Sequence, residues 1–142
     1  MKEEHKQLLL KDLCARLPYG VSIKTEGDDE FYTLLSVHPN KDIALIGLDM
    51  NSVYATSKVI IDKIKPYLRP MSSITEEEHD ELFSTQYNAE MEEIKNSGDY
   101  LKASIIGDMA KYDWLNSHHF DYRGLIDNEL ALEAPKNMYI IK

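Results

Sequence analysis

The sequence predicts an α+β fold: a leading helix, a small antiparallel meander or barrel-like sheet, and an acidic helical region at the C-terminal end. Three observations support this. Apolar residues recur at helical spacing in 3–17, short β-rich runs separated by turn residues fill 20–65, and a helix-capping motif precedes 76–95. With 142 residues, 43% of them hydrophobic, the chain has the size and composition of a globular domain.

The first element is a helix over residues 3–17. Leu9 and Leu13 recur at a spacing that places them on one face, and charged residues fill much of the remainder. Cys14 is expected to be a small buried hydrophobic residue rather than a nucleophile. Pro18 ends the helix, because proline disfavours the helical conformation in the residue before it.

Short strands are expected between residues 20 and 65. Runs at 31–37 and 43–48 are rich in β-forming residues, and apolar residues at every second position from 53 to 61 predict a further strand. A helix over 52–65 is the alternative, because apolar residues there also fit one helical face. Tight turns between short strands favour an antiparallel arrangement.

Two prolines, Pro66 and Pro70, predict a stiff joint, because proline interrupts regular helix and lacks a backbone N–H. The chain is therefore expected to divide into a helix-plus-sheet lobe at 1–66, a joint at 67–75 and an acidic helical lobe at 76–142. The lobes are expected to pack as one compact domain.

The acidic region begins with a helix over 76–95. Thr75 and Glu78 form a capping box, and glutamates in the first turn suit the positive end of the helix dipole. Four apolar residues of this helix are expected to face the core: Phe83, Tyr87, Met91 and Ile94.

The last third of the chain is less clearly patterned. Gly107 interrupts an apolar helical pattern, so the favoured prediction is a short helix over 109–117 with Asp108 as its N-cap. Two short edge strands are expected at 130–132 and 138–141.

The formal charge of −9 lies entirely in the second half of the chain. Residues 1–71 hold ten basic and ten acidic side chains, whereas residues 72–142 hold six and fifteen. An acidic surface repels phosphate backbones, so direct binding to nucleic acid is not expected. The acidic surface either serves only to keep the protein soluble or forms the docking site for a basic partner.

Cys14 is the only cysteine, so an internal disulfide cannot form. No apolar run approaches the roughly 18 residues of a membrane span, and the N-terminal apolar run is too short for a signal peptide. These features predict a cytoplasmic protein without a membrane partner.

The stretch 113–126 is the richest in side chains that can carry chemistry. Four of them are of types that ligate transition metals: Asp113, His118, His119 and Asp121. Adjacent histidines on a helix point about 100° apart, and the spacing is not the His-Glu-x-x-His pattern. The favoured interpretation is that the histidines end a helix and interact with its last carbonyls. No catalytic residue and no cofactor is predicted.

The same stretch is the best candidate for a binding surface. The side chains considered for it are aromatic or cationic: Tyr112, Trp114, His118, His119, Tyr122 and Arg123. Trp114 is expected to be buried, as large rings usually are, and Tyr112 and Tyr122 are expected to offer exposed contacts. Gly124 is expected to take a positive φ, and Arg123 is expected to pair with a nearby acid, with Asp121 as a candidate.

Three segments together carry a resemblance: KDLCARLPYGV at 11–21, KPYLRPMSS at 65–73 running into Thr75–Glu78, and DWLNSHHFDYRGLI at 113–126. With them the chain resembles a family of small uncharacterised proteins encoded by prophages and mobile elements of gut anaerobic bacteria. The resemblance covers the ends of the chain and the expected joint. It implies an intracellular, phage-associated accessory role, and it carries over no catalytic residue.

The favoured function is therefore a non-enzymatic interaction module that binds another protein through 112–126, through the helix 76–95, or through both. A homo-oligomer is compatible with this interpretation. One alternative is a small metal-dependent hydrolase that uses Asp113, His118, His119 and Asp121. A second is an acidic regulator of nucleic-acid machinery.

Overall fold

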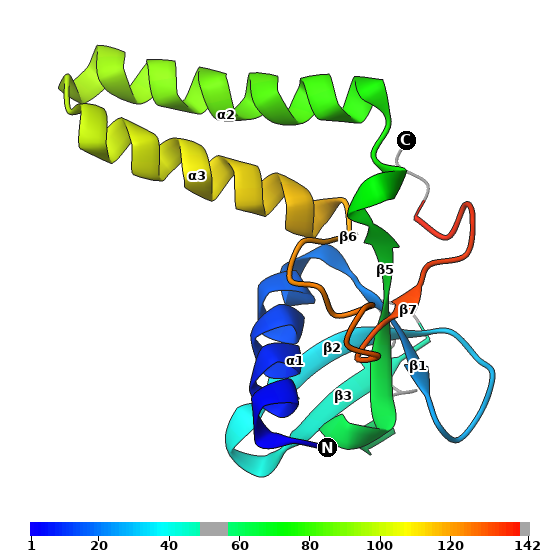
Figure 1. Cartoon of the computed structure of the whole chain (residues 1–142). Helices are drawn as coiled ribbons and strands as arrows, with labels where there is room; N and C mark the ends of the chain where they lie inside the picture. The colour runs from blue at the N-terminus through cyan, green and yellow to red at the C-terminus, as the bar shows by residue number, and fades with distance from the viewer. Residues whose placement is uncertain (49–56, 140–142) are drawn as a thin grey trace.

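The computed structural model describes residues 1–48 and 57–139, which form the α+β fold expected from the sequence. The helices are α1 (Glu3–Arg16), α2 (Glu76–Ser97) and α3 (Tyr100–Ser117). The strands are β1 (Ser22–Thr25), β2 (Tyr32–His38), β3 (Ile43–Gly47), β4 (Ser57–Ile60), β5 (Ile64–Pro70), β6 (Phe120–Asp121) and β7 (Leu132–Glu133). Figure 1 shows α1 lying against the sheet and the α2–α3 hairpin extending away from both.

The sheet is open, with the strand order β4-β3-β2-β1-β5-β6 and with β7 beside β5. Strands β1 to β4 form an antiparallel meander, and β5 returns to pair antiparallel with β1. The expected meander is therefore confirmed, and the sheet does not close into a barrel among the described residues. The strand expected at 53–61 is confirmed for Ser57–Ile60, while its first part lies outside the described residues.

The two prolines on which the expected joint at 67–75 depends lie within a strand. Pro66 and Pro70 belong to β5, whose first half pairs with β1 and whose second half pairs with β6 and β7. Pro66 is the last residue paired with β1, opposite Ile23, and Pro70 is the last paired with β6. Proline is tolerated there because the ladder on that side ends and needs no further N–H donor.

Helix α1 covers one face of the sheet. Leu9, Leu10 and Leu13 join strand residues such as Ile23 and Leu34 in the main core. Cys14 is exposed, contrary to expectation, although Leu10 one turn earlier on the same side of the helix is buried, so the groups that cover Leu10 do not reach position 14. The apolar face of α1 is therefore narrower than the sequence suggested.

The boundaries of α2 agree with its sequence signals. Thr75 Oγ1 accepts a hydrogen bond from the Glu78 N–H at 3.1 Å, and the Glu78 carboxylate accepts one from the Thr75 N–H, which completes the capping box. Gly98 ends the helix in the left-handed conformation at φ 69°.

The expected core face of α2 is wrong for three of its four residues. Phe83, Tyr87 and Met91 are 53%, 60% and 39% exposed, and the buried leucine is Leu82. The hairpin projects from the sheet, so α2 packs mainly on α3, and that neighbour covers a different face of the helix.

Helix α3 is longer than expected. It runs unbroken from Tyr100 to Ser117, with Asp99 rather than Asp108 as its N-cap. Asp99 Oδ1 accepts a hydrogen bond from the Lys102 N–H at 3.0 Å. Gly107 is buried inside the helix, where its missing side chain leaves room for Glu90 of α2.

The segment after α3 returns to the sheet. Leu125, Leu130 and Ala131 join the main core beside α1, and β7 pairs in parallel with β5. The strand expected at 130–132 is found one or two residues later, as Leu132–Glu133. Of the strand expected at 138–141, residues 138 and 139 form a turn, and the others lie outside the described residues.

No helix in the described part of the chain combines the length and the apolar character needed to cross a membrane.

Candidate functional site

The four side chains considered as metal ligands are directed to different places. Asp113 is exposed on α3, whereas His119 and Asp121 are buried and His118 is half-buried. Across residues 1–48 and 57–139, no three or more His, Cys, Asp or Glu side chains are grouped to hold a metal ion. Three of the four candidates, His118, His119 and Asp121, have partners within the chain.

His118 ends α3. Its Nδ1 lies 2.9 Å from the Trp114 carbonyl oxygen, one of the last carbonyls of the helix. Its ring stacks on the Trp114 indole with centroids 3.8 Å apart and planes inclined by 16°. The expectation that a histidine interacts with the last carbonyls of this helix is confirmed for His118.

His119 is buried between the end of α3 and the C-terminal segment. It takes a positive φ of 64°, and its ring stacks on that of Tyr139 at 3.7 Å. Burial, with the positive charge of Arg16 as the next cause, lowers the pKa of His119 from 6.5 to about 3. The imidazole is therefore neutral at physiological pH.

Tyr139 connects this stack to the sheet. Its hydroxyl donates to the Tyr67 carbonyl oxygen at 2.7 Å and accepts from the Ser22 N–H at 2.9 Å. Burial raises the pKa of Tyr139 to about 12. The phenol is therefore a fixed structural hydrogen-bonding group at neutral pH.

Asp121 caps the turn that follows it. Its two carboxylate oxygens accept hydrogen bonds from the N–H groups of Leu125 and Ile126, each at 2.9 Å. Gly124 within this turn has φ 76°, as expected. Arg123 pairs with an acid, as expected, but the partner is Asp12 of α1 at 3.1 Å rather than Asp121, whose carboxylate is occupied by the backbone.

A buried ion network that the sequence reading missed lies beneath this turn. Asp12 and Arg16 are both fully buried, with Arg16 Nε 2.8 Å from Asp12 Oδ2. Arg16 also donates to the Phe120 carbonyl oxygen. A signal was present, because the two opposite charges stand four residues apart on the face that carries Leu9 and Leu13.

The base of the hairpin is held by a second set of contacts. Arg69 of β5 donates two hydrogen bonds of 2.8 Å to the Glu78 carboxylate of α2, and its guanidinium lies 4.1 Å from the centre of the Phe120 ring. The hydrogen bonds from Arg69 lower the pKa of Glu78. Phe120 stacks in turn on Trp114, so strand and both helices share one cluster.

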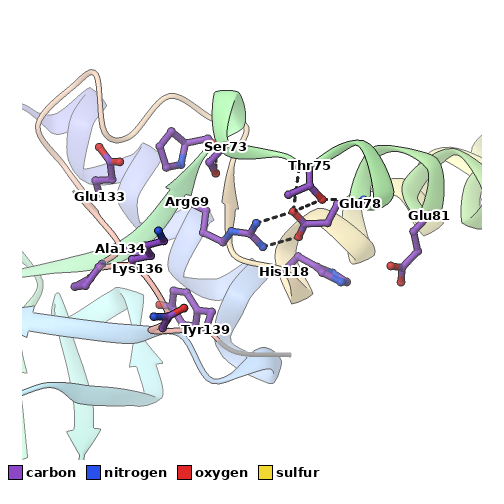
Figure 2. Close-up of a pocket in the computed structure, with 13 residues that line it drawn as sticks. Arg69, Ser73, Thr75, Glu78, Glu81, His118, Glu133, Ala134, Lys136 and Tyr139 are labelled. Carbon is purple, nitrogen blue, oxygen red and sulfur yellow. Dashed lines mark hydrogen bonds and ion pairs between the residues drawn. The ribbon is translucent and has the colours of Figure 1, made fainter. Parts of the chain in front are cut away.

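A cavity of about 850 Å³ opens beside this joint. Figure 2 shows Arg69 directed at Glu78 on one side, with Lys136 and Tyr139 of the C-terminal segment on another. Its hydroxyl groups already have partners: Ser73 Oγ donates to the Pro70 carbonyl oxygen at 2.6 Å, and Thr75 serves the capping box. The Thr75 hydroxyl also lies 3.1 Å from Glu78 Oε1, but both oxygens of that carboxylate already accept hydrogen bonds from Arg69. The described lining is therefore a polar recess whose hydroxyl groups and carboxylate hold the base of the hairpin together.

The residues considered for a binding surface differ in how exposed their side chains are. Trp114 is buried at 6%, as expected, and His119 is buried as well. Tyr112 is 44% exposed, whereas Tyr122 is half-buried and donates to Asn116 Oδ1 at 3.0 Å. Among the aromatic side chains of the expected contact surface, Tyr112 on α3 is therefore the one that is exposed enough to contact a partner.

The hairpin carries most of the exposed large apolar side chains. On α2 they are Phe83, Tyr87 and Met91, and on α3 they are Tyr100, Leu101, Ile105, Met109 and Tyr112. Each helix thus has a row at intervals of four residues or nearly so, which is the spacing of a helix face that packs against another surface. The sequence reading found the row on α2 but assigned it to the core.

No protein-family model, no curated protein and no solved structure matches this chain.

Proposed function

We propose that this protein is a non-enzymatic interaction module that binds a basic, amphipathic helical segment of another protein through the outer face of α2. The observation that carries the proposal is the exposed row of Phe83, Tyr87 and Met91 on an acidic helix that projects from the sheet. Isolated exposed apolar residues are ordinary, whereas an aligned row on a projecting element is typical of an interaction surface.

The row can supply enough free energy to anchor a partner. Burying a side chain such as Phe or Met against a partner contributes roughly 1.5–3 kcal/mol before the costs of association are subtracted. Three such side chains, spaced by four residues, lie on successive turns of α2, as the anchors of an amphipathic helix do. We expect moderate affinity, because the row is short.

Charge selects the partner. Helix α2 holds eight acidic residues and one lysine. Glu76 and Asp80 are exposed and continue the row toward the N-terminal end of the helix, at spacings of four and three residues from one another and from Phe83. A basic group on the partner would therefore lie beside its apolar anchors, and the same charge disfavours direct binding of nucleic acid.

The stretch 113–126 supports this proposal in another way. The polar side chains of His118, His119 and Asp121 are engaged inside the chain, so they hold the hairpin base and the C-terminal segment together rather than forming a reactive centre. We place the protein in the cytoplasm, where a free exposed thiol such as Cys14 is normal. An accessory role in a prophage or mobile element agrees with the resemblance.

A photo-cross-linking residue at position 87 of the full chain tests the proposal in a lysate of the source cells. We expect one main adduct, cross-linked within a basic segment with apolar residues at helical spacing. Its yield should fall with added salt and with Asp80→Asn or Phe83→Ser. The same residue at exposed position 11 of α1 is the matched control.

Equal adducts at positions 87 and 11, no adduct at all, or a salt-independent adduct to an acidic segment would contradict the proposal. If the captured protein itself binds nucleic acid through the cross-linked segment, the module is the acidic regulator considered above.

A further inference from the structure

We propose that a second copy of this chain docks on the outer face of α3, so that the protein forms a two-fold symmetric dimer. The surface is separate from the face of α2 assigned to a basic partner. It consists of Leu101, Ile105, Met109 and Tyr112, which are 74%, 52%, 56% and 44% exposed.

This row points away from α2. Ala103 and Gly107 are the buried residues of the middle of α3, and Gly107 meets Glu90 of α2. Ile105 stands two residues from each of them, which is about 200° around a helix. The row is therefore on the opposite side of α3 from its partner helix, where another element can approach without disturbing the hairpin.

The charge of α3 suits a second copy. The helix holds two lysines, Lys102 and Lys111, and two aspartates, Asp108 and Asp113, so its net charge is zero. Two copies of α3 therefore do not repel one another. Because this surface carries no net charge, it also gives no electrostatic preference for a strongly basic or acidic partner. Helix α2, with its excess of acid, is unsuited to self-pairing for the same reason.

The row is also self-complementary when two α3 helices run antiparallel. A two-fold axis near position 107 places Ile105 beside Met109 of the second copy and Leu101 beside its Tyr112. Each α2 then lies outside the α3 pair. Packed helices are about 8–10 Å apart, so the two acidic helices are separated by well over the Debye length of ~8 Å, and salt screens their repulsion.

The contact spans three helical turns, which is at the lower end of specific interfaces, so we expect a dimer in the micromolar range. Sedimentation velocity of the full chain, from low micromolar to millimolar concentration, should show a monomer that converts to a dimer. Ile105→Glu should leave a monomer at every concentration, because it places carboxylates in the apolar contact. Tyr87→Glu, the matched change on α2, should still dimerise while losing the basic partner.

Oxidative cross-linking gives a second measurement, which reports which residues face one another across the contact. In a Cys14→Ser background, Ile105→Cys with Met109→Cys should give a disulfide-linked dimer, whereas Ser84→Cys with Asn88→Cys on α2 should not. A wild-type chain that is monomeric throughout, a dimer that survives Ile105→Glu, or equal cross-linking of the two cysteine pairs would overturn the inference. None of these outcomes bears on the cross-linking at position 87, so the two proposals fail separately.

Discussion

Gly107 of α3 lies so close to Glu90 of α2 that a Cβ atom at position 107 would be 2.3 Å from Glu90 Cγ. Contact at that distance requires the glutamate side chain to move. The glycine that interrupts the apolar pattern of α3 is therefore a position where the Glu90 side chain of α2 packs directly on the backbone of α3.

A double-mutant cycle tests this relationship. Gly107→Ala alone should change the free energy of unfolding by less than about 1 kcal/mol, because improved helix propensity is offset by the displaced glutamate. With Glu90→Ala also present, the same change should stabilise the protein by about 1 kcal/mol. Chemical denaturation of the four variants measures the coupling, and strict additivity would contradict the contact.

The buried ion pair of Asp12 and Arg16 predicts a large loss of stability when one partner is removed. Asp12→Asn leaves the Arg16 charge buried without its counter-ion and should cost about 3–5 kcal/mol. Glu4→Gln, a matched change at an exposed acid of the same helix, should cost less than about 0.5 kcal/mol. Thermal and denaturant unfolding compare the two, and a similar small effect for both would show that Asp12 is not buried with Arg16.

His119 predicts a pH dependence of stability. Its pKa is lowered in the folded state to about 3, so between pH 6.5 and 3 the unfolded chain binds a proton that the folded chain does not. Stability should therefore fall with decreasing pH across that window, by up to about 1.4 kcal/mol for each pH unit from this group, and should be unaffected by it above pH 7. The difference between the wild type and His119→Phe isolates the contribution. Parallel pH profiles for the two proteins would contradict it.

Truncation of two neighbouring residues of α2 should destabilise the protein to very different extents. Leu82→Ala removes a side chain buried against Trp114 and Phe120 and should cost about 2–4 kcal/mol. Phe83→Ala removes a side chain that is 53% exposed and should cost less than about 1 kcal/mol. Urea unfolding of both variants measures the two free-energy changes. A larger cost at position 83 than at position 82 would show that Phe83 faces the core, as the sequence suggested.

Local patterns predicted most of the elements correctly. The capping box of Thr75 and Glu78, the β-rich runs that form β2 and β3, and the proline after α1 each depend on a few neighbouring residues. Backbone preference is a local property, so such signals are readable without knowledge of the rest of the chain. The same holds for the histidine that ends α3.

Burial was decided by the arrangement of the elements in space. Helix α2 offers Leu82 and Phe83 on adjacent faces, and only the position of α3 determines that the first is covered and the second is exposed. The charged side chains of Asp12 and Arg16 can be buried because residues more than 100 positions later in the chain supply hydrogen-bond partners: the Phe120 carbonyl oxygen for Arg16 and the Arg123 guanidinium for Asp12. A side chain is buried by its neighbours, and those neighbours are distant in the chain, so periodicity alone identifies a helix but not which of its faces meets the core.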